Sequence, residues 1–226
     1  LSNSTFNFAR YITTDEFKRI GKKSNPKFSI AEAMSKTVRT FADVQDFFNR
    51  GDFEKISLQL SGLQLDSRLI QPGDIFLAIQ GLHHHGLSFL SSAVQNGAAL
   101  VIADKPIHDS PIPALVVSDL KSRIGEFSSW FYGYPSRSMT MLGITGTNGK
   151  TTIAHLIQYL WNSLGLASGT IGTLGVAFAG KNERFEYPGV RTTPEAPELQ
   201  AVFKKMLDSH VQKVVMEVSS HALSLG

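Results

Sequence analysis

The sequence predicts an α/β protein made of a small N-terminal α/β domain and an α/β central domain, only part of which lies within the chain. Three observations lead to this prediction. Short apolar runs alternate with helical patterns, which is typical of mostly parallel sheets covered by helices. A glycine-rich segment separates a strand pattern from a helix pattern within residues 139–164. The 226 residues, 42% of them hydrophobic, are enough to form two separate cores.

Composition narrows the classes of partner. The formal net charge of +3 is too small to indicate nucleic-acid binding. No apolar run approaches the roughly 20 residues of a membrane span. The chain has no cysteine, which excludes disulfides and thiolate chemistry and fits a reducing, cytoplasmic location. The chain begins with Leu1 and stops at Gly226 without a terminating signal, and we interpret it as a fragment.

Residues 1–40 form an N-terminal extension rich in serine, threonine and lysine. It lacks the apolar segment of a secretory signal. A plain extension is favoured over an organellar transit peptide because Asp15, Glu16 and Glu32 interrupt the basic composition. Residues 27–39 and 41–49 each predict a short helix.

Residues 41–137 predict the N-terminal domain. Apolar runs at 58–60, 75–79, 100–103 and 114–117 indicate strands, and residues 89–94 indicate a helix closed by Asn96-Gly97. A turn is expected at residues 71–74. Asp119 is expected to cap a helix with the apolar face Leu120, Ile124, Phe127 and Phe131, which Tyr134-Pro135 ends. Residues 136–138 are the expected boundary, so the central domain spans 138–226.

The central domain opens with a buried strand, a glycine loop and a helix. Residues 139–145 are the strand, and Gly146 and Gly149 free the backbone to turn tightly around a ligand. Amide groups at a helix N-terminus bind anions, Lys150 suits phosphates, and the Thr151 hydroxyl suits Mg²⁺. The pattern therefore predicts ATP and Mg²⁺, although Ile144 stands where the general phosphate-loop pattern has glycine.

The rest of the domain continues the alternation. A strand is expected at 169–173, a hairpin from 176–178 and 184–186, and a helix from about Leu199, with Thr192 or Thr193 as its N-cap and Pro194 in its first turn. The last stretch, 214–223, opens with a buried strand that ends in Glu217. A buried carboxylate is costly without a cation or donors, and a carboxylate beside a phosphate strand commonly holds Mg²⁺.

Three consecutive histidines, His83 to His85, raise the question of a metal site. Adjacent residues of an extended strand point to opposite faces and make a poor chelate. No second group of ligands accompanies them, so metal binding is disfavoured here.

Beyond these patterns, the exact sequences of several segments resemble those of the Mur ligases, which build the peptidoglycan precursor. The segment 146–152, Gly-Thr-Asn-Gly-Lys-Thr-Thr, resembles their nucleotide loop; the related folylpolyglutamate synthetases usually have Gly-Ser after the lysine. Residues 65–68 and 72–76, followed by Gly81, resemble the UDP-binding N-terminal domain of the MurE-type and MurF-type ligases. Residues 192–195 and 216–223 favour the MurE type.

The resemblance implies roles for individual residues. Lys150 and Glu217 would be catalytic, and Thr151 and Glu217 would hold Mg²⁺. The other implied contacts are Gly146, Thr147, Asn148, Gly149, Lys150, Thr151 and Thr152 for ATP, and Leu65, Ser67, Leu82, His83, His84, Thr192, Thr193 and Ser219 for the substrate. Two departures stand out: His85-Gly86 replaces an Asp-Gly pair, and Arg191 precedes the threonines where the family often has Asn or Leu.

The implied activity is an ATP-dependent ligation through an acyl phosphate. It adds meso-diaminopimelate or lysine to UDP-N-acetylmuramoyl-L-alanyl-D-glutamate, and we expect a cytoplasmic monomer. The family's carbamylated lysine and third domain do not lie within these residues, so we expect residues 1–226 alone to be inactive. A MurF-type ligase, a folylpolyglutamate synthetase and a non-catalytic MurE-like interaction protein are the alternatives.

Overall fold

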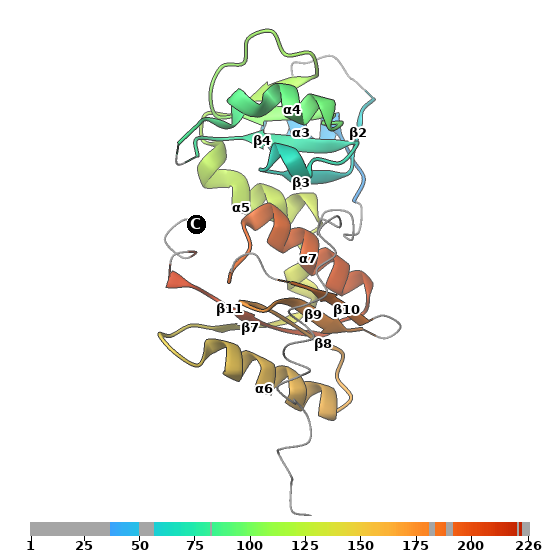
Figure 1. Ribbon diagram of the computed structural model, residues 1–226. Helices are drawn as coiled ribbons and strands as arrows, with labels where there is room; N and C mark the ends of the chain where they lie inside the picture. The colour runs from blue at the N-terminus through green and yellow to red at the C-terminus, as the bar shows by residue number, and fades with distance from the viewer. Residues whose placement is uncertain are drawn as a thin grey trace, which may run out of the picture.

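Two β-sheets, formed largely from the apolar runs that predict strands, organise the chain (Figure 1). The structure is a computed structural model. It describes residues 37–49, 57–81, 83–180, 184–188, 192–220 and 222. The predicted alternation of strands and helices around mostly parallel sheets is confirmed.

The first sheet has four parallel strands in the order β3-β4-β5-β6. Their bounds are Gly62–Gln64, Asp74–Ala78, Leu100–Ala103 and Ala114–Val116. Every residue of β4 and β5 is buried. Such unbroken apolar runs are expected of central parallel strands, because helices cover both of their faces.

The helices α3, α4 and α5 cover this sheet. They span Phe41–Phe47, Leu90–Gln95 and Leu120–Phe131, and α3 and α5 pack on the face opposite α4. Short 3-10 helices occupy Ser67–Leu69 (η2), Gly86–Phe89 (η3) and Pro135–Ser138 (η4). Asp119 is the N-cap residue of α5, as expected. Its ψ of 17° departs from the extended backbone of most capping residues, and its side chain makes no capping hydrogen bond.

A two-stranded ribbon precedes α3. The strand β1 (Arg39–Thr40) pairs antiparallel with β2 (Gln59–Leu60). The helix predicted over residues 27–39 is therefore wrong at its C-terminal end, and residues 27–36 lie outside the described part. The Thr40 side chain and Asp43 cap α3 reciprocally, which fixes where that helix begins.

The second sheet follows the order β10-β9-β8-β11-β7. Its strands are β7 (Thr140–Ile144), β8 (Ser168–Gly172), β9 (Gly175–Ala179), β10 (Arg184–Tyr187) and β11 (Lys213–Glu217). The strands β7, β11 and β8 are parallel, while β9 and β10 form the predicted hairpin. Residues 181–183 of its turn lie outside the described residues.

Helices α6 (Lys150–Ser163) and α7 (Ala196–Asp208) lie on opposite faces of the second sheet (Figure 1). The helix α7 packs between this sheet and α5, and its Ala201 belongs to the core of the first sheet. The short helix η4 leads from α5 to β7. The proposed domain boundary at residue 138 stays a prediction.

The strand β7 is not buried as the sequence predicts. Leu142 is 36% exposed, and Ile153 and Leu160 of the following helix α6 are also exposed. Among the described residues, β7 is an edge strand with a neighbour on one side only. Apolar composition therefore identified a strand here without fixing its burial.

The hydroxyl of Tyr132, at the end of α5, accepts a hydrogen bond from the buried Leu63 N–H at 3.2 Å. Burial raises the pKa of Tyr132, so the phenol stays neutral. We expect Tyr132→Phe to lower the free energy of unfolding by about 1–3 kcal/mol, because the Leu63 N–H loses this partner. Urea unfolding measures the change. Tyr187→Phe, on the edge strand β10, is the control and should shift stability by less than about 0.5 kcal/mol; equal losses would contradict the assignment.

Candidate nucleotide and acceptor site

The loop between β7 and α6 has the backbone geometry of an anion-binding turn. Gly146 has a φ of 140° and Gly149 a φ of 79°, conformations that side-chain-bearing residues rarely adopt. Gly149 is the N-cap of α6, and its carbonyl accepts from the Ile153 N–H at 2.9 Å. The exposed loop therefore presents the N-terminus of a 14-residue helix, where amide groups and the helix dipole attract an anion.

Lys150 adds a cation to this loop. Its Nζ donates to the Gly146 carbonyl at 2.7 Å, so the side chain folds back across the turn. Gly146, Thr147, Asn148, Gly149 and Thr152 are exposed, which leaves the loop open to solvent. The sequence placed all these residues in a phosphate loop, and the geometry has the features that such a loop requires.

Glu217 stands at the C-terminal end of β11, in register with Ile144 at the end of β7. It is 1% exposed. The Thr151 hydroxyl donates to its Oε2 at 2.9 Å, and the Thr173 N–H donates to its Oε1 at 2.9 Å. The Thr173 hydroxyl donates to Oε2 at 3.2 Å. The structure thus brings Thr151 and Glu217 together as predicted, and hydroxyl and amide donors compensate the buried carboxylate.

These groups also fit Mg²⁺. A carboxylate and a hydroxyl oxygen beside a phosphate loop are hard ligands of the kind that Mg²⁺ takes together with substrate phosphates and water. Within the described residues, no group of three or more histidine, cysteine, aspartate or glutamate side chains could hold a metal alone.

Burial lowers the pKa of the nearby His155, and the Glu217 carboxylate opposes this shift.

Thr193 does not cap α7. The N-cap is Glu195, with Pro197 in the first turn, so the expected caps Thr192 and Thr193 and the expected Pro194 are wrong. The Thr193 hydroxyl instead donates to the Glu217 carbonyl at 3.0 Å and accepts from the Ser219 N–H at 3.2 Å. It is engaged at the end of β11 and is not available to the helix.

The three predicted acceptor residues Thr192, Thr193 and Ser219 nevertheless gather beside Glu217. Thr192 Oγ1 lies 3.2 Å from Thr173 Oγ1, and Thr193 Oγ1 lies 3.4 Å from Ser219 Oγ. Thr173 was not predicted as a site residue from the sequence. The one signal for it was its position directly after Gly172, at the end of the strand β8 that pairs with β11.

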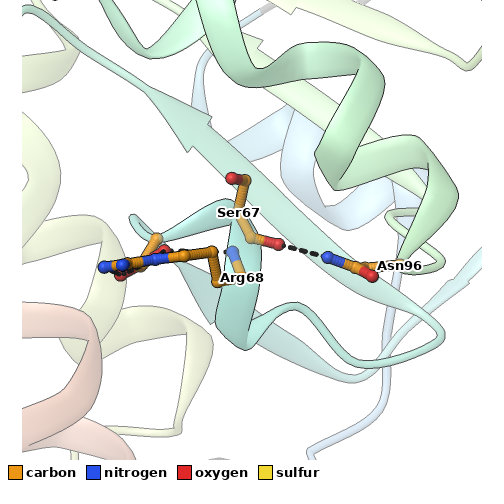
Figure 2. A network of polar contacts seen from close by, with 4 residues as sticks. Ser67, Arg68 and Asn96 are labelled. Atoms are coloured by element: carbon orange, nitrogen blue, oxygen red, sulfur yellow. Dashed lines mark hydrogen bonds and ion pairs between the residues drawn. The ribbon is translucent and has the colours of Figure 1, made fainter.

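A second candidate region lies in the first sheet, after β3. Ser67 is buried at the start of η2, and its carbonyl accepts from Asn96 Nδ2 at 2.8 Å (Figure 2). Asp66 caps η2 by accepting from the Arg68 N–H at 3.0 Å and pairs with the Arg68 guanidinium. The segment thus forms the local turn that Asp-Ser-Arg favours. Leu65 is half-buried against the core.

The histidine segment follows β4. His83 and His84 are exposed, and Leu82 lies outside the described residues. His85 Nδ1 accepts from the Leu87 N–H at 3.1 Å, and His85 Nε2 lies 2.6 Å from Asp104 Oδ1. A carboxylate can only accept, so the proton sits on Nε2. Both ring nitrogens of His85 are therefore engaged in hydrogen bonds.

No helix within the described ranges is long and apolar enough to cross a membrane.

Comparison with known proteins defines the class. The described features are those of an α/β nucleotide-binding protein with a phosphate loop. Residues 144–226 match the model of the Mur ligase middle domain, and residues 59–124 match the model of the Mur ligase family, catalytic domain. Together the two models cover more than half of the chain, and it belongs to the Mur ligase family.

Curated relatives agree with this assignment. The chain is 42% identical over 172 residues to the UDP-N-acetylmuramoyl-L-alanyl-D-glutamate--2,6-diaminopimelate ligase of Xanthomonas campestris pv. campestris, covering 75% of this chain and 34% of the relative. It is 38% identical over 167 residues to the ligase of the same name from Bacillus velezensis, covering 74% and 33%. The chain therefore spans about a third of the length of these relatives.

Solved structures show the same fold. A structure titled UDP-N-acetylmuramoyl-L-alanyl-D-glutamate--2,6-diaminopimelate ligase aligns with a TM-score of 0.63 and 26% identity, covering 84% of this chain and 37% of that one. MurF from Acinetobacter baumannii aligns with a TM-score of 0.57 and 21% identity over 82% of this chain and 37% of its own, a likeness of fold alone.

The Glu217 carboxylate packs directly against Gly172 and leaves no space there for a larger residue. A Cβ at this position would overlap Glu217 Oε1. We expect Gly172→Ala to lower the free energy of unfolding by about 1–3 kcal/mol, because the buried Glu217 must move. Gly125→Ala is the control: it lies within α5, where an added Cβ meets nothing within 4 Å, and alanine favours the helix. Urea unfolding of both variants decides, and a Gly172→Ala protein as stable as the native one would contradict the assigned position of Glu217.

The proton position on His85 is directly measurable. We expect a ¹⁵N NMR spectrum near neutral pH to show the Nε2–H tautomer, because Nε2 faces the Asp104 carboxylate and Nδ1 accepts from Leu87. Asp104→Asn should alter the His85 signals and leave those of the exposed His83 unchanged. An Nδ1–H tautomer in the native protein would contradict the geometry.

Proposed function

We propose that this chain contributes the UDP-sugar-binding part and the ATP-binding part of an ATP-dependent ligase. The ligase would attach 2,6-diaminopimelate to UDP-N-acetylmuramoyl-L-alanyl-D-glutamate in peptidoglycan synthesis, in the cytoplasm where ATP and the UDP-sugar are available. The observation that carries the proposal is the 2.9 Å contact between Thr151, directly after the phosphate loop lysine, and the buried Glu217. Membership in the Mur ligase family and the names of the curated relatives support it.

The proposed reaction forms the amide in two steps. An oxygen of the substrate's carboxylate attacks the γ-phosphorus of ATP, the bond to the bridging oxygen breaks, and ADP leaves. The amine of the incoming amino acid then attacks the acyl phosphate carbon, and the tetrahedral intermediate expels phosphate as the amine proton is lost. Catalysis of the first step is mainly positioning and neutralisation of charge.

Residues of the chain supply this positioning. The amides of residues 146–152 and the Lys150 ammonium would hold the phosphates. Thr151 and Glu217 would hold Mg²⁺, which when bound neutralises phosphate charge. Thr192, Thr193 and Ser219 would place the carboxylate of the substrate. Thr193 and Ser219 are bonded to each other at the end of β11, and Thr192 contacts Thr173, which binds Glu217. Leu65, Ser67, Leu82, His83 and His84 would contact the UDP-sugar at the first sheet.

The decisive test uses the protein expressed from its complete reading frame. It is incubated with ATP, Mg²⁺, UDP-N-acetylmuramoyl-L-alanyl-D-glutamate and either meso-diaminopimelate or lysine, and products are weighed by mass spectrometry. We expect a mass gain with diaminopimelate. A gain only with a muramoyl-tripeptide acceptor would move the assignment to the MurF type. No gain with any acceptor, in a protein that binds ATP, would favour the non-catalytic interaction protein.

Residues 1–226 alone are expected to form no amide. The chain spans about a third of the length of the curated ligases that it matches. Steady ligation by this chain in the same assay would contradict the expectation.

Lys150→Ala separates the two binding sites. We expect the variant to weaken ATP binding at least tenfold, because the loop loses the cation that folds across Gly146. Binding of the UDP-sugar should be unchanged, since its proposed site lies in the other sheet. Isothermal titration calorimetry measures both affinities, and Lys121→Ala on the exposed surface of α5 is the control. Loss of both affinities in Lys150→Ala would refute the division into two sites.

A further inference from the structure

We propose that Thr173 is a positioning residue that couples occupancy of the acceptor site to the orientation of the Glu217 carboxylate. The inference rests on the proposed function, because it assigns Glu217 to the nucleotide side of the reaction and Thr192 to the acceptor side. Thr173 lies between them, in the turn after β8. Its N–H and hydroxyl both donate to Glu217, and its Oγ1 lies 3.2 Å from Thr192 Oγ1.

The direction of each hydrogen bond follows from the chemistry of the groups. An ionised carboxylate only accepts, so the Thr173 hydroxyl gives its single proton to Glu217 Oε2. The 3.2 Å contact with Thr192 therefore has Thr192 as the donor. A continuous chain of donors runs from Thr192 through Thr173 to the carboxylate, and Thr151 donates to the same Oε2 from the other side.

The two oxygens of Glu217 are held differently. Oε1 accepts from the Thr173 main-chain amide, which cannot rotate away from its own backbone, and Oε1 lies in the space that a Cβ on the adjacent Gly172 would fill. Oε2 accepts from two threonine hydroxyls, which rotate freely about their C–O bonds. The amide thus fixes the carboxylate plane, while the hydroxyls can release Oε2 for a ligand.

This arrangement links the two ends of the site. When the substrate carboxylate accepts the hydrogen bond of the Thr192 hydroxyl, Thr192 no longer donates to Thr173 Oγ1. This change alters the hydrogen bonds that Glu217 Oε2 receives. A ligand on the nucleotide side that binds Oε2 frees the Thr173 hydroxyl, which changes the hydrogen bond between Thr173 and Thr192. Linkage of this kind is reciprocal, and each ligand changes the affinity of the other by the same factor.

Thr193 has a different task, although it is the neighbour of Thr192. It holds the main-chain carbonyl of Glu217 and the Ser219 amide, and so fixes the path of the chain after β11. Thr173, in contrast, donates both of its hydrogen bonds to the Glu217 side chain. Because Thr173 is exposed, a side chain of the same shape is tolerated there.

The test measures coupling between two ligands by calorimetry on the native chain. The affinity for ADP with Mg²⁺ is determined with and without saturating UDP-N-acetylmuramoyl-L-alanyl-D-glutamate. We expect the dipeptide to change the native affinity about fivefold or more, the lower range of typical allosteric coupling. Thr173→Val, which loses the hydroxyl and keeps the amide, should bind each ligand alone but reduce this factor to near one. Thr173→Ser should restore it.

Thr140→Val, at the opposite end of β7, is the matched control and should keep the native factor. A Thr173→Val protein that binds both ligands with the native coupling factor would overturn the inference and leave the proposed function standing. A native chain that binds neither ADP nor the dipeptide would overturn the proposed function, and this inference with it.

Discussion

The second half of the structure depends on how a buried carboxylate is satisfied. Glu217 ends an inner strand of a sheet and is almost inaccessible to water. A buried charge without donors destabilises a protein strongly. Three donors compensate it here, from the start of α6 and from the turn after β8. Because Gly172 carries no side chain, the same turn can approach Glu217 closely enough to make these bonds.

Parallel strands explain why these groups meet. In a parallel sheet all carboxyl ends lie on one edge, and ligands of open α/β sheets bind beyond that edge. The phosphate loop follows β7, Thr173 follows β8, and Glu217 ends β11. The histidine segment follows β4 and Ser67 follows β3 in the other sheet. In Figure 1 the end of β11 and the loop from β7 to α6 lie at the same side of the molecule.

Much of this arrangement could be predicted from the sequence, and the misses have physical causes. The spacing of apolar residues located the strands and helices, because the residues that an element buries recur at its own period within a short stretch of sequence. The glycine loop could be placed because a tight turn with positive φ favours glycine, and Lys150 because it directly follows that loop. Side-chain partners depend on contacts between segments far apart in the chain. The Thr193 cap was wrong, and Asp119 stands at the N-cap position without a side-chain hydrogen bond, because composition shows that a hydroxyl or carboxylate is present but not which group it contacts. Thr173 and Asp104 were missed for the same reason.

His85 shows how a departure from a family pattern can keep a local structure. The family has an acidic residue before this glycine, and an aspartate accepts a hydrogen bond from a turn amide. His85 Nδ1 accepts from the Leu87 N–H in the same manner. The imidazole also carries a proton, which an aspartate at neutral pH lacks, and donates it to Asp104 after β5. With histidine at this position, the turn keeps its hydrogen bond to the Leu87 N–H. A second hydrogen bond, to Asp104, links the segments that follow the neighbouring strands β4 and β5. Since His83 and His84 directly precede His85, the His85–Asp104 hydrogen bond holds their backbone at the edge of the first sheet, where the UDP-sugar is proposed to bind.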